Sequence, residues 1–93
     1  MIKAKVRTAI NRVLRQRLKD IGFVSAEISE DEDHSGDPIL RIVIHYKKVE
    51  DGVDPSPTFS LARYVKDAVR PLGEDRFPHF THKFAEDQEL KVA

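Results

Sequence analysis

The sequence predicts an α+β fold, a two-layer sandwich of two helices and three strands in α-β-β-α-β order. Apolar residues recur every three or four positions over residues 2–22 and 57–73, as in amphipathic helices. They alternate over residues 23–30, 39–46 and 77–85, as in half-buried strands. The short turn after the first strand predicts antiparallel pairing with the second, whereas the intervening helix predicts that the second and third strands are parallel. We expect a three-stranded mixed sheet with both helices on one face.

The first predicted helix is strongly two-sided. Gly22 provides a left-handed end to it, and Phe23 follows where it can fold back on the last turn. Arg17 breaks the pattern because it projects near the middle of the apolar stripe. A guanidinium is costly to bury without a partner, so we expect Arg17 to pair within the chain, to snorkel or to meet another protein. The apolar stripe consists of Ile2, Val6, Ile10, Val13, Leu14, Leu18 and Ile21, and the opposite side carries Lys5, Arg12, Arg15 and Lys19.

The first two strands are predicted to place alternate residues in the core. The expected core face holds Val24, Ala26 and Ile28 from the first strand and Leu40, Ile42, Ile44 and Tyr46 from the second, which we interpret as the central strand. The other face of the sheet is expected to remain open. Its predicted residues are Ser25, Glu27, Arg41, Val43, His45, Thr81 and Lys83.

The second helix is predicted to start at Ser56, with Pro57 at its first helical position. In the third strand, His82 lies on the same side as Phe80 and Phe84, which favours a packed histidine that hydrogen-bonds a neighbour. We expect one α+β domain over residues 1–86 and a polar C-terminal tail over residues 87–93. The side chains expected in the core from the second helix are Leu61, Ala62, Val65, Ala68, Val69 and Leu72.

An acidic segment, residues 29–37, joins the first two strands. Asp31, Asp33, Ser35 and Gly36 match four positions of a calcium-binding loop, but Ile42 stands where that loop needs a bidentate carboxylate, and strands flank the segment. We therefore predict a hairpin turn rather than a metal site. Helix and strand lengths place this turn near the start of the first helix, where its acids would face Lys3, Lys5 and Arg7.

Composition excludes several classes of protein. The 93 residues carry 16 basic and 16 acidic side chains, so no net charge draws the chain to nucleic acid or membrane. There is no cysteine, no phosphate-binding loop and no nucleophile elbow, and the histidines are poorly spaced for zinc. We predict no enzymatic activity, no cofactor and no metal. No apolar run reaches membrane-spanning length, and we expect a cytoplasmic location.

The leading functional prediction is a small non-catalytic protein-interaction module. Its partner would be another protein, bound through the open sheet face or the first helix, with Arg41, His45, Lys83 and Arg17 as the candidate residues. The alternative is an RNA- or ribosome-associated protein that uses Lys5, Arg12, Arg15 and Lys19 on the first helix. A homodimer is also compatible with the sequence, because exposed sheet edges and opposite charge blocks could pair between chains.

Four short stretches resemble the N-terminal domain of the ribosome maturation factor RimP family. They are "LKDIGF" at 18–23, "LRIVI" at 40–44, "DGVD" at 51–54 and "LARYVKDAV" at 61–69. The resemblance implies the same order of helices and strands and a ribosome-associated role. The acidic "GDPILRI" hairpin and the later "FP" strand also look like those of small bacterial proteins with no assigned activity, which implies a bacterial origin.

Overall fold

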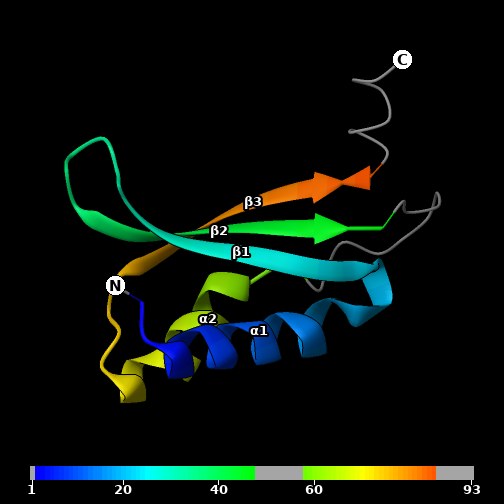
Figure 1. The fold of residues 1–93 in the computed structure, drawn as a ribbon, viewed down its shortest axis with the longest axis horizontal. Coiled ribbons are helices and arrows are strands. Elements are labelled where there is room, and N and C mark those ends of the chain that lie inside the picture. The colour runs from blue at the N-terminus through cyan, green and yellow to red at the C-terminus, as the bar shows by residue number, and fades with distance from the viewer. Residues whose placement is uncertain (1, 48–57, 86–93) are drawn as a thin grey trace.

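The computed structural model describes residues 2–47 and 58–85 and has the predicted α-β-β-α-β order (Figure 1). Each helix ends in a short 3₁₀ turn, and each turn is closed by a glycine in the left-handed region, Gly22 and Gly73. The α+β prediction is confirmed. The elements are α1 (Ala4–Leu18), η1 (Lys19–Ile21), β1 (Phe23–Glu32), β2 (Pro38–Tyr46), α2 (Leu61–Val69), η3 (Arg70–Leu72) and β3 (Phe77–Phe84).

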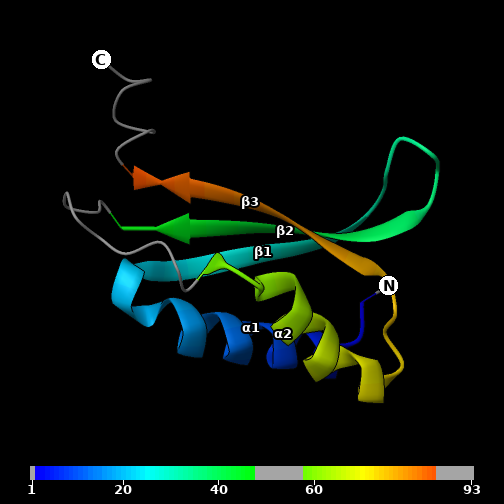
Figure 2. The ribbon, with the colours of Figure 1, turned by 180° about the vertical axis from the view of Figure 1, so that it is seen from behind.

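The described sheet has the order β1-β2-β3, so β2 is central as predicted. β1 and β2 are antiparallel, with Ile28 opposite Ile42, whereas β2 and β3 are parallel, with Ile42 opposite Phe80. Figures 1 and 2 show both helices on the same face of this sheet. β1 and β3 are the two edge strands, and the face away from the helices carries no described helix.

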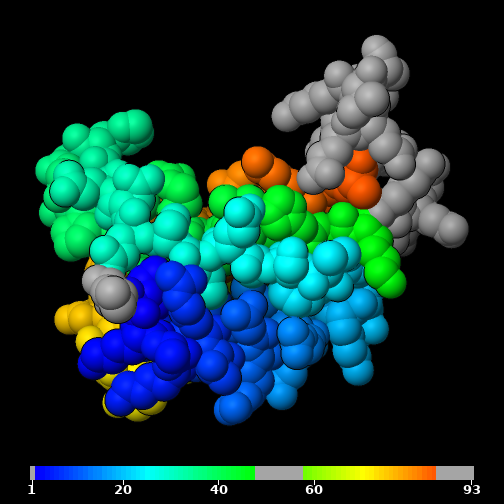
Figure 3. Space-filling view, viewed as in Figure 1, coloured from blue at the N-terminus to red at the C-terminus, as the bar shows by residue number. Residues whose placement is uncertain are grey.

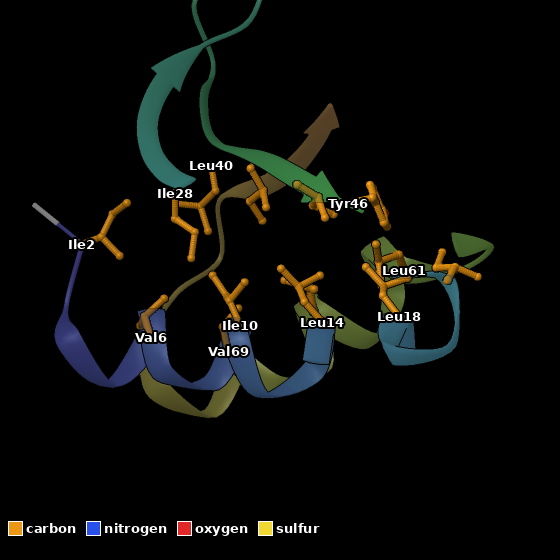
Figure 4. Close-up of a cluster of buried hydrophobic side chains, with 14 residues drawn as sticks. Ile2, Val6, Ile10, Leu14, Leu18, Ile28, Leu40, Tyr46, Leu61 and Val69 are labelled. Atoms are coloured by element: carbon orange, nitrogen blue, oxygen red, sulfur yellow. The ribbon is translucent and has the colours of Figure 1, made fainter. Parts of the chain in front are cut away.

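The core lies between β2 and the two helices (Figure 4). Leu40, Ile42 and Ile44 are fully buried, and Tyr46 is nearly so. The predicted apolar stripe of α1 points at them, with Val13 only partly buried. No described charged or polar residue is buried. The side chains that the helices contribute are Val6, Ile10, Leu14 and Leu18 from α1 and Leu61, Val65 and Val69 from α2.

The prediction that Val24 is a core residue is wrong. Its side chain is 54% exposed. The pairing with β2 is irregular between Phe23 and Ser25, so Val24 is an extra residue without a partner in the register. Such a bulge breaks the alternation of side chains, and Phe23 packs on the core instead.

The second helix begins later than predicted. α2 starts at Leu61 after Ser60, whose positive φ of 61° lies in the left-handed region and is incompatible with a continuous helix from residue 57. Ser56 and Pro57 themselves lie outside the described residues, as does the predicted tail. Within residues 2–47 and 58–85, no helix is both long and apolar enough to cross a bilayer.

Truncation of Leu14 is expected to destabilise the domain severely. The residue is fully buried between the layers, so Leu14→Ala should lower the free energy of unfolding by about 2–5 kcal/mol. Val24→Ala, at the exposed bulge, is the matched control and should change it by less than about 1 kcal/mol. Urea unfolding monitored by circular dichroism measures both. Equal losses in the two variants would contradict the layer assignment.

Candidate functional site

The open face of the sheet brings together three of the four residues predicted to bind a protein partner. Arg41 and His45 project from β2, and Lys83 on β3 is the register neighbour of His45. Each β2 residue is held by an acid from β1: Arg41 Nε lies 2.6 Å from Asp31 Oδ2, and His45 Nε2 lies 2.6 Å from Glu27 Oε2. The face therefore carries one ion pair and one histidine–carboxylate hydrogen bond, with Lys83 exposed beside the second.

These pairs change the acidity of both carboxyl groups. The hydrogen bond from Arg41 lowers the pKa of Asp31, and a bond from the Glu32 amide adds to the effect. The hydrogen bond to His45 lowers the pKa of Glu27, to which the charges of His45 and Lys83 also contribute. Both carboxylates remain solvent-exposed, so the pairs fix side-chain geometry more than they stabilise the fold.

The open face is not exposed along its whole length. Ile39 has the same side-chain parity as Arg41 but is only 2% exposed, and its register neighbour on β3 is Phe77. Phe77 is itself half exposed and contacts His79 edge-on and Lys66 from α2. On β2, the exposed polar part of the face therefore extends from Arg41 to His45.

Arg17 lies apart from the other three candidates. Its guanidinium stacks over the ring of Tyr64 in α2, 4.0 Å from the ring centroid. Arg17 is exposed rather than buried in the apolar stripe, and it bridges α1 and α2 in the helical layer. The intramolecular partner expected for Arg17 is thus present. Sequence reasoning did not identify Tyr64, because no local pattern connects residues on two different helices.

The basic side chains of α1 line a surface groove. Arg12 and Arg15 from α1, Lys19 from η1, and Val24 and Ala26 from β1 line an open groove of about 740 Å³. Figure 3 shows the side of the molecule where the blue α1 surface meets the cyan β1 surface. Among the described residues, no acidic side chain lines this groove.

The three groove cations have no ion pair or side-chain hydrogen bond in the part of the chain that the structure describes. Lys5, the fourth residue predicted for RNA binding, is not among the lining residues.

The acidic segment forms a turn, as predicted. The prediction that its acids pair with Lys3, Lys5 and Arg7 is wrong. Asp33 Oδ1 accepts hydrogen bonds from the Ser35 and Asp37 amides, which closes the turn. Within residues 2–47 and 58–85, none of its acids forms an ion pair with Lys3, Lys5 or Arg7. Arg7 instead donates to the backbone carbonyl of Ile28.

Two of the hairpin acids form ion pairs with arginines that follow them in the chain. Arg41 binds Asp31, as described above, and Arg76 Nη1 lies 3.3 Å from Glu30 Oε1. Arg76 also contacts Glu74, with 2.7 Å between Nη2 and Oε1. The hydrogen bond with Arg76 lowers the pKa of Glu74 and raises that of Arg76. No sequence signal pointed to Arg76, because its contact with Glu30 joins residues far apart in the chain.

His82 hydrogen-bonds a neighbour, as the sequence predicts, although the residue is exposed rather than packed in the core. Tyr46 Oη and His82 Nδ1 are 2.7 Å apart, and the two rings stack. Burial raises the pKa of Tyr46 to about 12 and lowers the pKa of His82. The phenol donates to Nδ1 when the neutral imidazole carries its proton on Nε2, and it accepts from Nδ1 in the other tautomer. In the described residues, no group of three or more His, Asp or Glu side chains is placed to hold a metal ion.

Comparison of the chain with models of protein families, with curated proteins and with solved structures found no match. The resemblance to the RimP family stays a prediction.

The Tyr46–His82 pair predicts a pH-dependent stability. Below about pH 6.5 the unfolded chain binds a proton at His82 before the folded chain does, so the free energy of unfolding should fall as the solution is acidified. Above about pH 10 the unfolded chain loses the Tyr46 proton first, so stability should fall again up to about pH 12. Urea unfolding measured across this range should show both losses.

NMR titration of the imidazole provides a direct check. The expected pKa of His82 is below about 6.5, because the surrounding side chains desolvate the charged form of the ring. A value at or above 6.5 in the wild type would contradict the assignment.

Proposed function

We propose that this chain is a small non-catalytic protein-interaction module, which binds another protein through the open face of its sheet. The observation that carries the proposal is the pair of ordered side-chain contacts, Arg41–Asp31 and His45–Glu27, beside the exposed Lys83. These groups are exposed to solvent, yet their conformations are already fixed by neighbours on the adjacent strand. A prearranged polar surface loses less side-chain entropy when a partner binds.

The chemistry of this surface favours a partner with both polar and apolar groups. Val43 lies between the two side-chain contacts and is partly exposed, so it offers a small apolar contact. The guanidinium of Arg41 retains donors that its single contact with Asp31 does not use. Arginine and aromatic anchors on a partner's surface commonly dominate such contacts.

The double variant Arg41→Ala/His45→Ala is expected to weaken partner binding at least tenfold while the domain stays folded. Neither side chain is buried, so removal should leave the core intact. A tagged pull-down from cytoplasm, with and without ribonuclease, identifies the partner by mass spectrometry. Isothermal titration calorimetry with the purified partner then measures the affinity.

Arg63→Ala/Asp67→Ala provides the matched control for this experiment. Both residues are exposed on α2, in the layer away from the open face. A partner retained by the control and lost by the open-face variant supports the proposal. Equal binding by both variants, or unfolding of Arg41→Ala/His45→Ala in circular dichroism, would contradict it.

The second candidate function is RNA or ribosome binding by the basic face of α1. The unpaired cations Arg12, Arg15 and Lys19 favour it, since they lie along one groove without an acid to neutralise them. The resemblance to the RimP family points the same way. Phosphate contacts by three or four such side chains release bound counterions.

Salt dependence tests the RNA alternative. If three or four phosphates are contacted, a plot of log affinity against log salt should have a slope of about −2 to −4. Arg12→Ala/Arg15→Ala should make the slope shallower by about 1.5–2, whereas Arg63→Ala/Arg70→Ala, on α2 and η3, should leave it unchanged. Fluorescence anisotropy with a labelled single-stranded RNA measures both. A slope near zero excludes this function.

A further inference from the structure

The outer edge of β1 is an unpartnered sheet edge with opposite charges at its two ends. β1 is the longest of the three described strands, with 10 residues, and only β2 pairs with it among them. Its first half borders the groove that contains Arg12, Arg15 and Lys19. Its second half carries Glu30, Asp31 and Glu32 and leads into the acidic hairpin. Long free edges of this kind are available for pairing with another strand.

We propose that a second copy of this chain docks on the β1 edge, with the two β1 strands antiparallel about a two-fold axis. In that arrangement, the basic half of each strand lies beside the acidic half of the other. The same surface therefore complements itself, as a two-fold interface requires. The dimer would contain a continuous sheet of six strands.

One register brings the charges together. If Ile28 of each copy lies on the axis, Ala26 is opposite Glu30 of the second copy, and its Glu32 lies beside the Val24 bulge. Side chains of alternate residues share one face of a strand. Ala26 and Ile28 face the helical layer, where they pack on the core, and Glu30 meets Arg76 on that side. Glu30 and Glu32 of the second copy would therefore enter the groove beside Arg12, Arg15 and Lys19.

Two further observations fit this occupant. Val24 is an exposed apolar side chain at the mouth of the groove, and the second strand would cover it. Glu32 is exposed, and its carboxylate has no ion pair or hydrogen bond in the part of the chain that the structure describes. The unpaired carboxylate of Glu32 on one copy would thus lie beside the unpaired cations of the groove on the other.

Arg7 occupies the centre of this interface in the single chain. Its Nη1 donates to the Ile28 carbonyl at 2.9 Å. In the dimer, the Ile28 amide of the second copy would take that position, because residues paired at the axis exchange backbone hydrogen bonds. Loss of Arg7 would leave the carbonyl without a partner only in the monomer. Arg7→Ala should therefore tighten the dimer, an effect that no interface elsewhere on the molecule predicts.

Charge-swap variants test the proposal by sedimentation velocity over a range of protein and salt concentrations. The wild type is expected to dimerise, more weakly at high salt. Arg12→Glu/Arg15→Glu should weaken dimerisation more than about 100-fold, since the symmetric interface contains each reversal twice. Glu30→Lys/Glu32→Lys should do the same. An equimolar mixture of the two variants should form a heterodimer, because each reversed patch then meets its complement.

Two controls keep the result interpretable. Arg63→Glu/Arg70→Glu makes the same change in net charge on α2 and η3 and should leave dimerisation unchanged. Glu32→Lys alone preserves the Glu30–Arg76 ion pair and replaces the double variant if circular dichroism shows that the double variant unfolds.

A wild type that stays monomeric at every concentration overturns the proposal, whether or not an RNA or an acidic peptide binds the groove instead. Dimers that survive both charge reversals overturn it as well. The proposed open-face function does not depend on this interface, because Arg41, His45 and Lys83 lie on the other face of the sheet and are unchanged in every variant.

Discussion

β2 is paired along both of its edges and packed against the helices on one face, and this double constraint determines the rest of the structure. Leu40, Ile42 and Ile44 fill the space between the sheet and the two helices, α1 and α2. A shift of one residue would place Arg41 and Val43 there instead, so the register of β2 is strongly specified. Because β3 aligns with β2 residue by residue, and β1 does so from Ser25 onward, the same register also decides which of their side chains form the open face.

The distribution of charge follows from this register rather than from the order of charges in the sequence. Arg41 binds Asp31 because their strands are neighbours, and Arg76 reaches Glu30 because β3 begins beside the hairpin. Within the described chain, the hairpin acids therefore pair with these two arginines and not with residues 3–19, although that basic segment contains more cations. The consequence is a groove on α1 whose cations lack partners within the described chain.

Repeating patterns within one segment were sufficient to predict the sheet and both helices, including the burial of Ile10 and Ile42. They also placed His82 beside a partner, since its aromatic neighbours share its parity. The errors occurred where a single residue departs from the repeat, as at the Val24 bulge and at Ser60 before α2. Contacts between distant segments, such as Arg17–Tyr64 and Arg76–Glu30, leave no periodic trace in the sequence, so patterns alone could not reveal them.

Side chains on the two faces of β1 are separate, so a partner bound at the open face and a second strand paired along the β1 edge would not compete for the same residues. Glu27 orients His45 on the open face, whereas Glu30 and Glu32 lie on the side of the helices, because the parity of a strand separates odd from even residues. A second strand added along the edge would contact the backbone and the helical side, and would leave Glu27 and its partner uncovered. Pairing at the edge would then place two open faces side by side on one extended sheet, and a partner with two matching patches would bind more tightly without any new kind of contact.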